Sequence, residues 1–424
     1  MSTAEITVTN ELLDQWATDP NGPVALHLKQ KLLPVEGEGG VIFPPTYADI
    51  GYNIDKLSDG TKVATIDSVG SQANRMEPMF KSVGTNEKGE ELNPLAALVP
   101  QIEIILNVKE KDGEEYRRRQ SLLDLAHRSA DAAVKATPSL AELINPAFEK
   151  LKRHGNAGPL CAIAPTSLLF GVWDSRDGTG EKRPRLVRSI IRAWDVDVLH
   201  SAAQFNSIWK SLDEETQNAL KEEAASKKTE LSEVGLADAP ATFRKTDKVA
   251  QFIDGVPNPK ARVLGGVRVN KEGLIQRDVT INLVALRGLR GENDKETKQI
   301  QKYVLSLALL TASTDLEMFL REGCLLRYAD EKNEWKIVPR RGEPQLIENF
   351  PGRDELVEFA KEGAKPFKDK WPKDEKEQPR PLEHIFGLDA AKSLLSKSAT
   401  KKAAKKGKEK AEDEAKADGQ QAES

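Results

Sequence analysis

The chain has 424 residues, of which 31% are charged and only 5% are aromatic, and its formal net charge is −4. This length can bury a large core. No apolar run approaches the roughly 20 residues that a membrane helix needs, and no signal-peptide pattern opens the chain. Two cysteines, Cys161 and Cys324, are poor support for a disulfide framework or a zinc site. These features predict a cytoplasmic protein without metal, cofactor or membrane contact.

The charges are segregated along the chain. Residues 213–235 hold seven acids and three bases, whereas residues 176–192 hold six bases and two acids. An acidic net charge counts mildly against nucleic-acid binding. Because the local electrostatic field matters more for binding than the net charge does, such a chain can still present a basic groove.

The first eighty residues predict a helix, a strand and a second helix. Residues 12–33 are predicted as a helix interrupted by Pro20 and Pro23. A β-branched run at residues 61–66 predicts a short strand, and Asp67 stands where a helix N-cap would lie. The apolar residues behind it recur at helical spacing and predict one buried face: Val69, Ala73, Met76 and Phe80.

Strands and helices alternate in the middle of the chain. Residues 101–108 are apolar at alternate positions, which predicts a half-buried strand, and Asp112-Gly113 is typical of a hairpin turn. Ser121 and Ser139 are each followed three residues later by an acid, which predicts two capped helix starts. A further strand is predicted at residues 166–173.

The second half of the chain predicts an acidic helical insertion at about residues 210–250 and a hairpin whose turn lies at residues 270–273. The other predicted elements are a core helix at residues 298–312 and a strand pair at residues 323–328 and 334–338. This order of strands and helices predicts an α+β fold. Residues 392–424 are polar and rich in lysine, which predicts a disordered tail.

The second helix carries the first candidate site. Four polar residues lie off its apolar stripe: Ser71, Gln72, Asn74 and Arg75. A helix start offers free N–H groups and a positive dipole end, which suit a phosphate, and these side chains add neutral donors and a forked cation. The alternative interpretation is the solvated polar face of a buried helix.

A basic run forms the second candidate site, which comprises Arg176, Lys182, Arg183, Arg185, Arg188 and Arg192. If this stretch is helical, Arg185, Arg188 and Arg192 share one stripe that suits a phosphate backbone. If it is a strand, the positive charge alone still favours phosphate. An ordinary basic loop at residues 175–184, balanced by acidic neighbours, is the alternative.

Paired glycines mark the third candidate site, which comprises Arg262, Gly265, Gly266 and Arg268. Such glycines allow a backbone to approach a ligand closely, and they suit a plain bulge or turn equally well. We predict no catalytic or metal site, because the five histidines are scattered and nothing beside Asp174 or Asp177 would activate an attacking group.

Three segments, at residues 22–49, 61–78 and 164–197, closely resemble the backbone subunit of the type I-G (formerly I-U) CRISPR interference complex, a RAMP-superfamily protein. The similarity runs from about Gly22 to the region of Arg327. The resemblance implies a modified RNA-recognition-motif (ferredoxin-like) palm within residues 1–391, with inserted finger and thumb elements. It also implies that the helix bearing Ser71 to Arg75 lies against the guide RNA.

The resemblance further implies a prokaryotic, non-catalytic protein that polymerises along CRISPR RNA and presents it for pairing with invading DNA. The implied partners are further copies of the chain, a repeat-processing subunit, a large subunit and a helicase–nuclease. With few aromatics, phosphate and sugar contacts are expected to dominate RNA recognition. Three alternatives stay open: an RNA-cleaving backbone subunit, a single-copy RNA-binding protein outside CRISPR, and a metabolic enzyme or scaffold.

Overall fold

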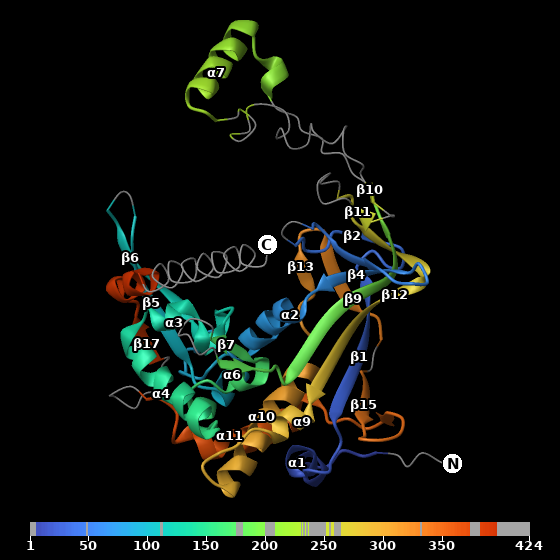
Figure 1. Cartoon of the computed structure of the whole chain (residues 1–424), viewed down its shortest axis with the longest axis vertical. Coiled ribbons are helices and arrows are strands. Elements are labelled where there is room, and N and C mark those ends of the chain that lie inside the picture. Colours follow the sequence, from blue (N-terminus) through green and yellow to red (C-terminus); the bar gives the residue numbers. More distant parts are fainter. Residues whose placement is uncertain are drawn as a thin grey trace, which may run out of the picture.

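A computed structural model describes most of the chain. The described residues are 6–47, 50–110, 113–174, 181–199, 208–229, 231, 234, 236, 252–253, 256–257, 264–330, 333–373 and 382–396. Arg176, Asp177, Arg262, most of the predicted acidic insertion and the tail from residue 397 lie outside this set, so the predictions for them stay predictions. Within the insertion, the structure describes helix α7 (Glu214–Ser226), which is N-capped by Asp213 and stands apart in Figure 1.

The centre of the fold is an antiparallel sheet with the strand order β13-β14-β1-β12-β9-β4-β3 (Figure 1). Three shorter strands extend it: β15 pairs with β1, β16 pairs with β15, and β2 pairs with β12. The strand bounds are β1 Ala25–Pro34, β2 Val41–Ile42, β3 Asn53–Lys56, β4 Lys62–Asp67, β9 Val187–Val198, β12 Val267–Asn282, β13 Phe319–Arg321, β14 Cys324–Tyr328, β15 Glu334–Val338 and β16 Gln345–Ile347.

Four positions of this sheet reproduce the ferredoxin-like order. Numbered along the chain, β1, β9, β12 and the pair β14/β15 stand in the order 4-1-3-2. Helix α2 (Val69–Met76) comes between the first and second of these strands, and α10 (Asp294–Ser313) follows the third. Both helices share one hydrophobic core with Leu26, Val187 and Val279 of the sheet. The predicted α+β class with an RNA-recognition-motif-like palm is therefore confirmed.

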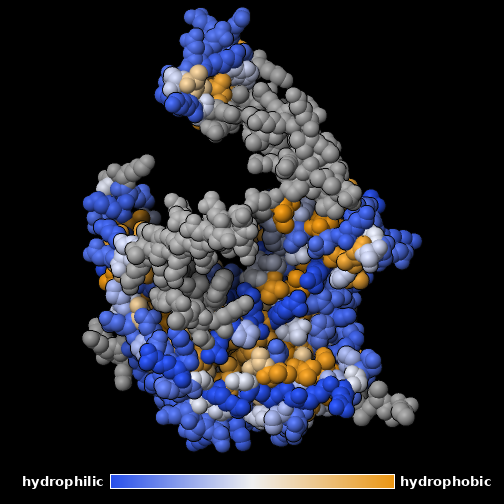
Figure 2. Space-filling view, viewed as in Figure 1, coloured by the Kyte–Doolittle hydropathy of each residue, from blue (hydrophilic) through white to orange (hydrophobic). Residues whose placement is uncertain are grey.

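A second lobe is built from the chain between α2 and β9 together with the C-terminal elements (Figure 1). Its small sheet has the order β17-β5-β6, and its residues belong to the same hydrophobic core as the palm helices. Its principal elements are β5 Ile102–Lys109, β6 Glu115–Ser121, α4 Pro138–His154, α5 Gly158–Ile163, α6 Pro165–Phe170, β7 Val172–Asp174, β8 Glu181–Arg183, α11 Arg353–Lys368 and β17 Leu382–Ile385. Hydrophobic side chains reach the surface near α9 (Leu283–Arg287), where Val284 is exposed (Figures 1 and 2).

The predicted helix at residues 12–33 is wrong over most of its length. Helix α1 covers only Asn10–Thr18 and is N-capped by Thr9, and the chain then enters strand β1. Leu26, Leu28 and Leu32 of that strand are fully buried at alternate positions. The break at Pro20 and Pro23 therefore separates two elements of different period rather than two halves of one helix.

The predicted strand at residues 166–173 is also wrong. These residues form α6 and only the start of β7. All of α6 is buried, and a fully buried apolar run has no polar face from which a helical period could be read. By contrast, the structure confirms the strand at residues 101–108 as β5 and the core helix at residues 298–312 as part of α10.

The predicted hairpin at residues 270–273 is instead a bulge within the single long strand β12. Its register against β9 shifts between Val269 and Leu274. Gly273 passes so close to β9 that an added Cβ would lie 2.2 Å from the Trp194 carbonyl oxygen. Strands β14 and β15 do exist, but each pairs with β1 rather than with the other, so the predicted strand pair is wrong.

Two of the three predicted N-caps are displaced. Ser68 rather than Asp67 caps α2, and Thr137 precedes α4 while the hydroxyl of Ser139 contacts His384 Nδ1 at 2.8 Å. Ser121 is a cap as predicted, but for a single 3-10 turn, Leu122–Asp124. Short polar side chains near a helix start compete for this role, and tertiary partners decide which of them is free.

Candidate nucleic-acid interface

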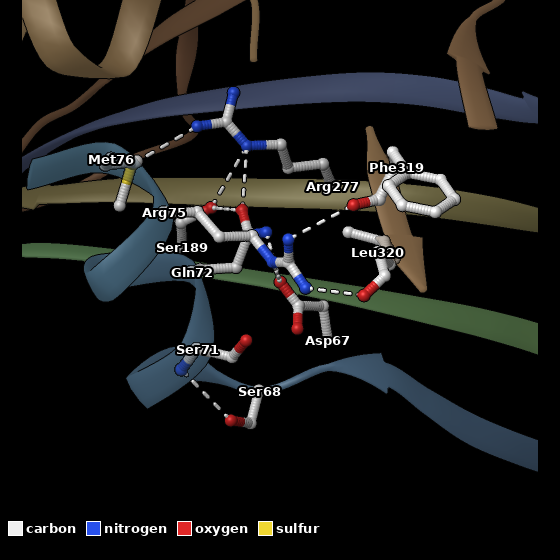
Figure 3. A network of polar contacts seen from close by, with 10 residues as sticks. All are labelled: Asp67, Ser68, Ser71, Gln72, Arg75, Met76, Ser189, Arg277, Phe319 and Leu320. Atoms are coloured by element: carbon white, nitrogen blue, oxygen red, sulfur yellow. Dashed lines mark hydrogen bonds and ion pairs between the residues drawn. The ribbon is translucent and has the colours of Figure 1, made fainter. Parts of the chain in front are cut away.

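Helix α2 is fixed to the palm sheet by a buried polar network (Figure 3). Gln72 stands at its centre and is fully buried. Its Nε2 donates to Asp67 Oδ2 at 2.6 Å, and its Oε1 accepts from Ser189 Oγ at 2.7 Å and from Arg277 Nε at 3.1 Å. One amide therefore links a buried carboxylate on β4 with a hydroxyl on β9 and a guanidinium on β12.

Burying Arg277 costs more free energy than burying any other side chain of this network, because its charged guanidinium is fully buried. It donates to Gln30 Oε1 at 2.6 Å and to Met76 Sδ at 3.4 Å. Among the described residues it has no carboxylate at ion-pair distance, and burial lowers its pKa. Its hydrogen bonds to neutral acceptors offset the cost of burying the charge, and they fix the middle and the last residue of α2 against the sheet.

Arg75 uses all three of its guanidinium nitrogens within the protein (Figure 3). Nε lies 3.1 Å from the buried Asp67 carboxylate, and Nη1 and Nη2 donate to the carbonyls of Phe319 and Leu320 at 3.3 and 2.9 Å. The prediction that Gln72 stays available for a ligand is therefore wrong, and Arg75, which is partly exposed, already has a protein partner at each guanidinium nitrogen. The overlooked signal is Asp67, since a carboxylate at the end of a buried strand needs partners nearby.

Ser71 and Asn74 are the two predicted residues that remain on the outer side of α2. Ser71 is half-buried and Asn74 is exposed. Arg185 joins them, because its Nη2 lies 3.9 Å from the point where a Cβ on Gly70 would stand. We call Gly70, Ser71, Asn74 and Arg185 the α2 edge. It combines the start of a helix, a small residue and an exposed cation, which is the chemistry of a phosphate contact.

The basic run does not form a helix. Residues 187–198 are strand β9, so the predicted helical stripe is wrong. Ser189 points towards Gln72, and since side chains alternate along a strand, Arg188 and Arg192 lie on the opposite face of the sheet. Neither has an ion-pair partner among the described residues, and Arg188 is exposed. Their charge still suits a phosphate backbone, but these arginines and the α2 edge occupy different surfaces.

Of the remaining members of the basic run, only the side chain of Arg183 is described by the structure. Arg183 on β8 is half-buried, and its Nη2 donates to the carbonyl of Leu151 at 3.3 Å. Arg176 and the side chains of Lys182 and Asp174 lie outside the described part of the chain. The predictions for those three side chains stay predictions.

The face of the palm sheet opposite α2 forms a wider cationic surface, which sequence reasoning missed. We define this open face by His27, Lys29 and Lys31 of β1, Arg188 and Arg192 of β9, and their cross-strand neighbours Gln276, Asp278, Thr280, Glu334 and Lys336. Every charged side chain that β1 and β9 contribute to it is basic. Three acids partly balance the basic side chains of this face: Asp278 lies 3.3 Å from His27 Nε2, Glu334 pairs with Lys336 at 2.8 Å, and Glu38 lies 3.8 Å from Lys31 Nζ.

The open face was missed because the predicted helix at residues 12–33 covers most of strand β1. The available signal was the alternation Leu26, Leu28 and Leu32 against His27, Lys29 and Lys31, which predicts a strand with one apolar and one basic face. A second missed feature lies on the β5–β6 hairpin, whose turn was predicted: the side chains of Tyr116, Arg117 and Arg118 are exposed there.

Three of the four residues of the third candidate site belong to the described part of the chain. Gly265 and Gly266 are buried where the chain enters β12, and their backbones exchange hydrogen bonds with Leu199 at 2.7 and 2.9 Å. Gly266 has a φ of +101°, and a Cβ on it would lie 2.6 Å from Val41 Cγ1. These contacts favour the bulge-or-turn alternative for the glycines. Arg268 is exposed beside them, and Arg262 lies outside the described residues.

A comparison with protein-family models matches part of the chain to a CRISPR-associated family. Residues 26–198 match the family model described as CRISPR-associated protein GSU0053 (Cas_GSU0053). The matched segment begins in β1, includes α2 and ends with β9, so it holds two of the four palm strands. The match supports a CRISPR-associated role for the chain. No curated protein matches it, and no described helix has the length and apolarity to cross a membrane.

Proposed function

We propose that this chain is a non-catalytic, RNA-binding backbone subunit of a type I CRISPR interference complex. Copies of the chain polymerise head to tail along the guide RNA, a heterologous contact that propagates rather than closes. The observation that carries the proposal is the family match at residues 26–198, because it falls on a ferredoxin-like palm with exposed cations. The assignment to type I-G rests on the sequence resemblance.

The charge pattern of the palm supports a ligand with a repeating negative backbone. Arg188 and Arg192 lie without ion-pair partners among the described residues, and Arg185 is exposed beside the start of α2. Cations of this kind contact phosphates independently of base sequence. A backbone subunit must hold any guide, and base pairing between guide and invading DNA then supplies the sequence information.

The proposed partners follow from the same role. Further copies of the chain extend the filament, a repeat-processing subunit holds one end of the guide, and a large subunit senses the target. A recruited helicase–nuclease degrades the DNA, so this subunit needs no reaction of its own.

Copurification tests this proposal directly. The chain is expressed with a CRISPR array and purified without nuclease, and the bound nucleic acid is extracted and sequenced. We expect array-derived RNA with the wild type and much less with the Arg185→Ala/Arg188→Ala/Arg192→Ala variant. A charge-matched control, Lys295→Ala/Lys298→Ala/Arg341→Ala, removes exposed cations elsewhere and is expected to retain the RNA.

Each outcome bears on the proposal. Failure of the wild type to retain RNA, alone and with the partner subunits added, would overturn it. Bound RNA unrelated to the array would favour a single-copy RNA-binding protein instead. Equal loss of RNA from the cationic variant and the control would show that net charge, rather than the palm surface, holds the RNA.

A further inference from the structure

Arg128 lies beneath the α2 edge in a conformation that few non-glycine residues adopt. It begins a short 3-10 turn, Arg128–Ala130, and its φ is +54°. Its side chain is buried, with 3% of the residue exposed. A left-handed backbone and a buried guanidinium are both unfavourable by themselves, and they persist only where the surrounding contacts require them.

Each of the three guanidinium nitrogens of Arg128 has one of these contacts. Nε lies 2.6 Å from Oε2 of the buried Glu77, and Nη1 donates to the carbonyl of Gly171 at 3.4 Å. The group also lies over the Phe170 ring, 5.2 Å from its centroid. Nη2 donates to Asn74 Oδ1 at 3.2 Å, which is the one contact that reaches the exposed surface of α2.

This last contact decides which way the amide of Asn74 faces. A guanidinium has only donors, so Asn74 must turn its carbonyl oxygen towards Arg128. Its Nδ2 group, with two N–H donors, is then left on the exposed side, and it has no acceptor among the described residues. Burial lowers the pKa of Arg128 and Glu77 opposes this shift, while Arg185, the exposed cation of the α2 edge, lies close enough to lower the pKa further.

We propose that Glu77 and Arg128 are positioning residues that hold Asn74 as an outward hydrogen-bond donor for a phosphodiester oxygen of the bound nucleic acid. The inference rests on the proposed function and adds an assignment of roles to three residues. A phosphate accepts hydrogen bonds but donates none, so an amide presented the other way would repel it. Fixing the amide in advance also removes an ordering cost from binding.

Two substitutions of Asn74 separate this role from a structural one. The probe is a labelled synthetic RNA of the guide sequence that copurifies with the full-length protein. Asn74→Ala removes the donor and is expected to weaken affinity about tenfold, the usual size for one hydrogen bond to a charged acceptor. Asn74→Asp keeps an acceptor for Arg128 but turns a carboxylate towards the phosphate, so we expect a larger loss than with alanine.

A merely structural Asn74 would give the reverse order, because aspartate preserves the contact with Arg128 and alanine does not. Asn21→Asp, on the exposed loop after α1, adds the same charge elsewhere and is expected to change affinity less than twofold. Asn74→Asp binding as tightly as Asn74→Ala, or more tightly, would overturn the inference.

A double-mutant comparison tests the positioning pair itself. Glu77→Met/Arg128→Met replaces the buried pair by apolar side chains, a change that folded proteins often tolerate. We expect it to weaken RNA binding severalfold by freeing the amide, and to reduce the effect of a further Asn74→Ala change to less than threefold. A full tenfold effect of Asn74→Ala in this background would contradict the positioning role.

The two levels of failure are distinguishable. If the wild type binds no guide RNA, the proposed function fails. If the wild type binds and Arg185→Ala weakens binding while Asn74→Asp does not, the proposed function stands and this inference fails.

Discussion

The two faces of the palm sheet both carry polar side chains, but they differ in whether the donors are already used. On the face under α2, Gln72, Ser189 and Arg277 are hydrogen-bonded to one another and to the neighbouring Asp67, Gln30 and Met76. On the open face, Arg188 and Arg192 have no ion-pair partner among the described residues. A polar residue in a conspicuous motif therefore indicates a binding surface only where its donors remain free, and Gln72 shows how strongly the motif alone can mislead.

The largest expected effect follows from breaking the buried polar network between α2 and the sheet. Gln72→Ala would leave Asp67 and Arg277 without their shared partner inside the core. Arg75 still pairs with Asp67, and Gln30 and Ser189 still accept from Arg277, so we expect the free energy of unfolding to fall by about 3 kcal/mol, the upper range for buried polar groups that lose a hydrogen-bond partner. Urea denaturation measures this. Ser71→Ala, one residue earlier and half-buried, is the control and should change stability by less than about 0.5 kcal/mol.

If Gln72→Ala lowered the free energy of unfolding by less than about 1 kcal/mol, the contrast between the hydrogen-bonded face under α2 and the open face would be contradicted. It would mean that water or a rearranged side chain replaces the amide, so that the network does not fix α2 to the sheet.

A pH-dependent effect of intermediate size is expected from Glu77. Burial raises the pKa of this carboxyl from its ordinary 4.5 to about 7, although Arg128 opposes the shift. The folded state therefore holds the proton more tightly than the unfolded chain does. The resulting stabilisation is complete below about pH 4.5 and is lost as the pH rises through about 7.

Glu77→Gln removes this titration, so its stability relative to the wild type should improve between pH 5 and pH 8. The expected change in that difference is about 2 kcal/mol. Urea denaturation of both proteins at the two pH values measures it. Glu87→Gln, on an exposed turn, is the matched control and should show no such change. A pH-independent difference for Glu77→Gln would show that Glu77 is not held protonated by its surroundings.

The sequence predicted an element well where a single hydrophobic period runs through it without a break. β5 and α10 fall where alternate-residue and strongly apolar patterns placed them. The predictions failed at β1 and α6: the helical interpretation continued past a proline into β1, and α6 is buried on all sides. The ferredoxin-like order itself came from resemblance, because strand order depends on which distant strands pair, and local patterns do not contain that information.

The candidate site was predictable in composition but not in arrangement. Ser71, Asn74, Arg185 and Arg188 are accessible, or partly so, as expected. The burial of Gln72 could not be inferred, since it depends on Ser189 and Arg277, which are 117 and 205 residues away in the chain. For the same reason the sequence could not show that Arg188 and the α2 edge lie on different faces.

The smallest effect is expected from the open face, and it sharpens the contrast because stability and affinity should separate there. Arg188→Ala/Arg192→Ala removes two cations that have no ion-pair partner among the described residues, so the free energy of unfolding should change by less than about 0.5 kcal/mol. RNA affinity should fall, and the slope of log affinity against log salt concentration should decrease by about 1.4, or about 0.7 for each single-strand phosphate that the protein no longer neutralises. Fluorescence titration at several salt concentrations measures the slope.

Arg75→Ala provides the opposite case. Its partner Asp67 is buried, so this substitution should lower the free energy of unfolding while leaving the salt slope of RNA affinity unchanged. An unchanged slope for the double variant, with a lowered slope for Arg75→Ala, would reverse the roles assigned to the two faces and place the RNA on the side of α2 alone.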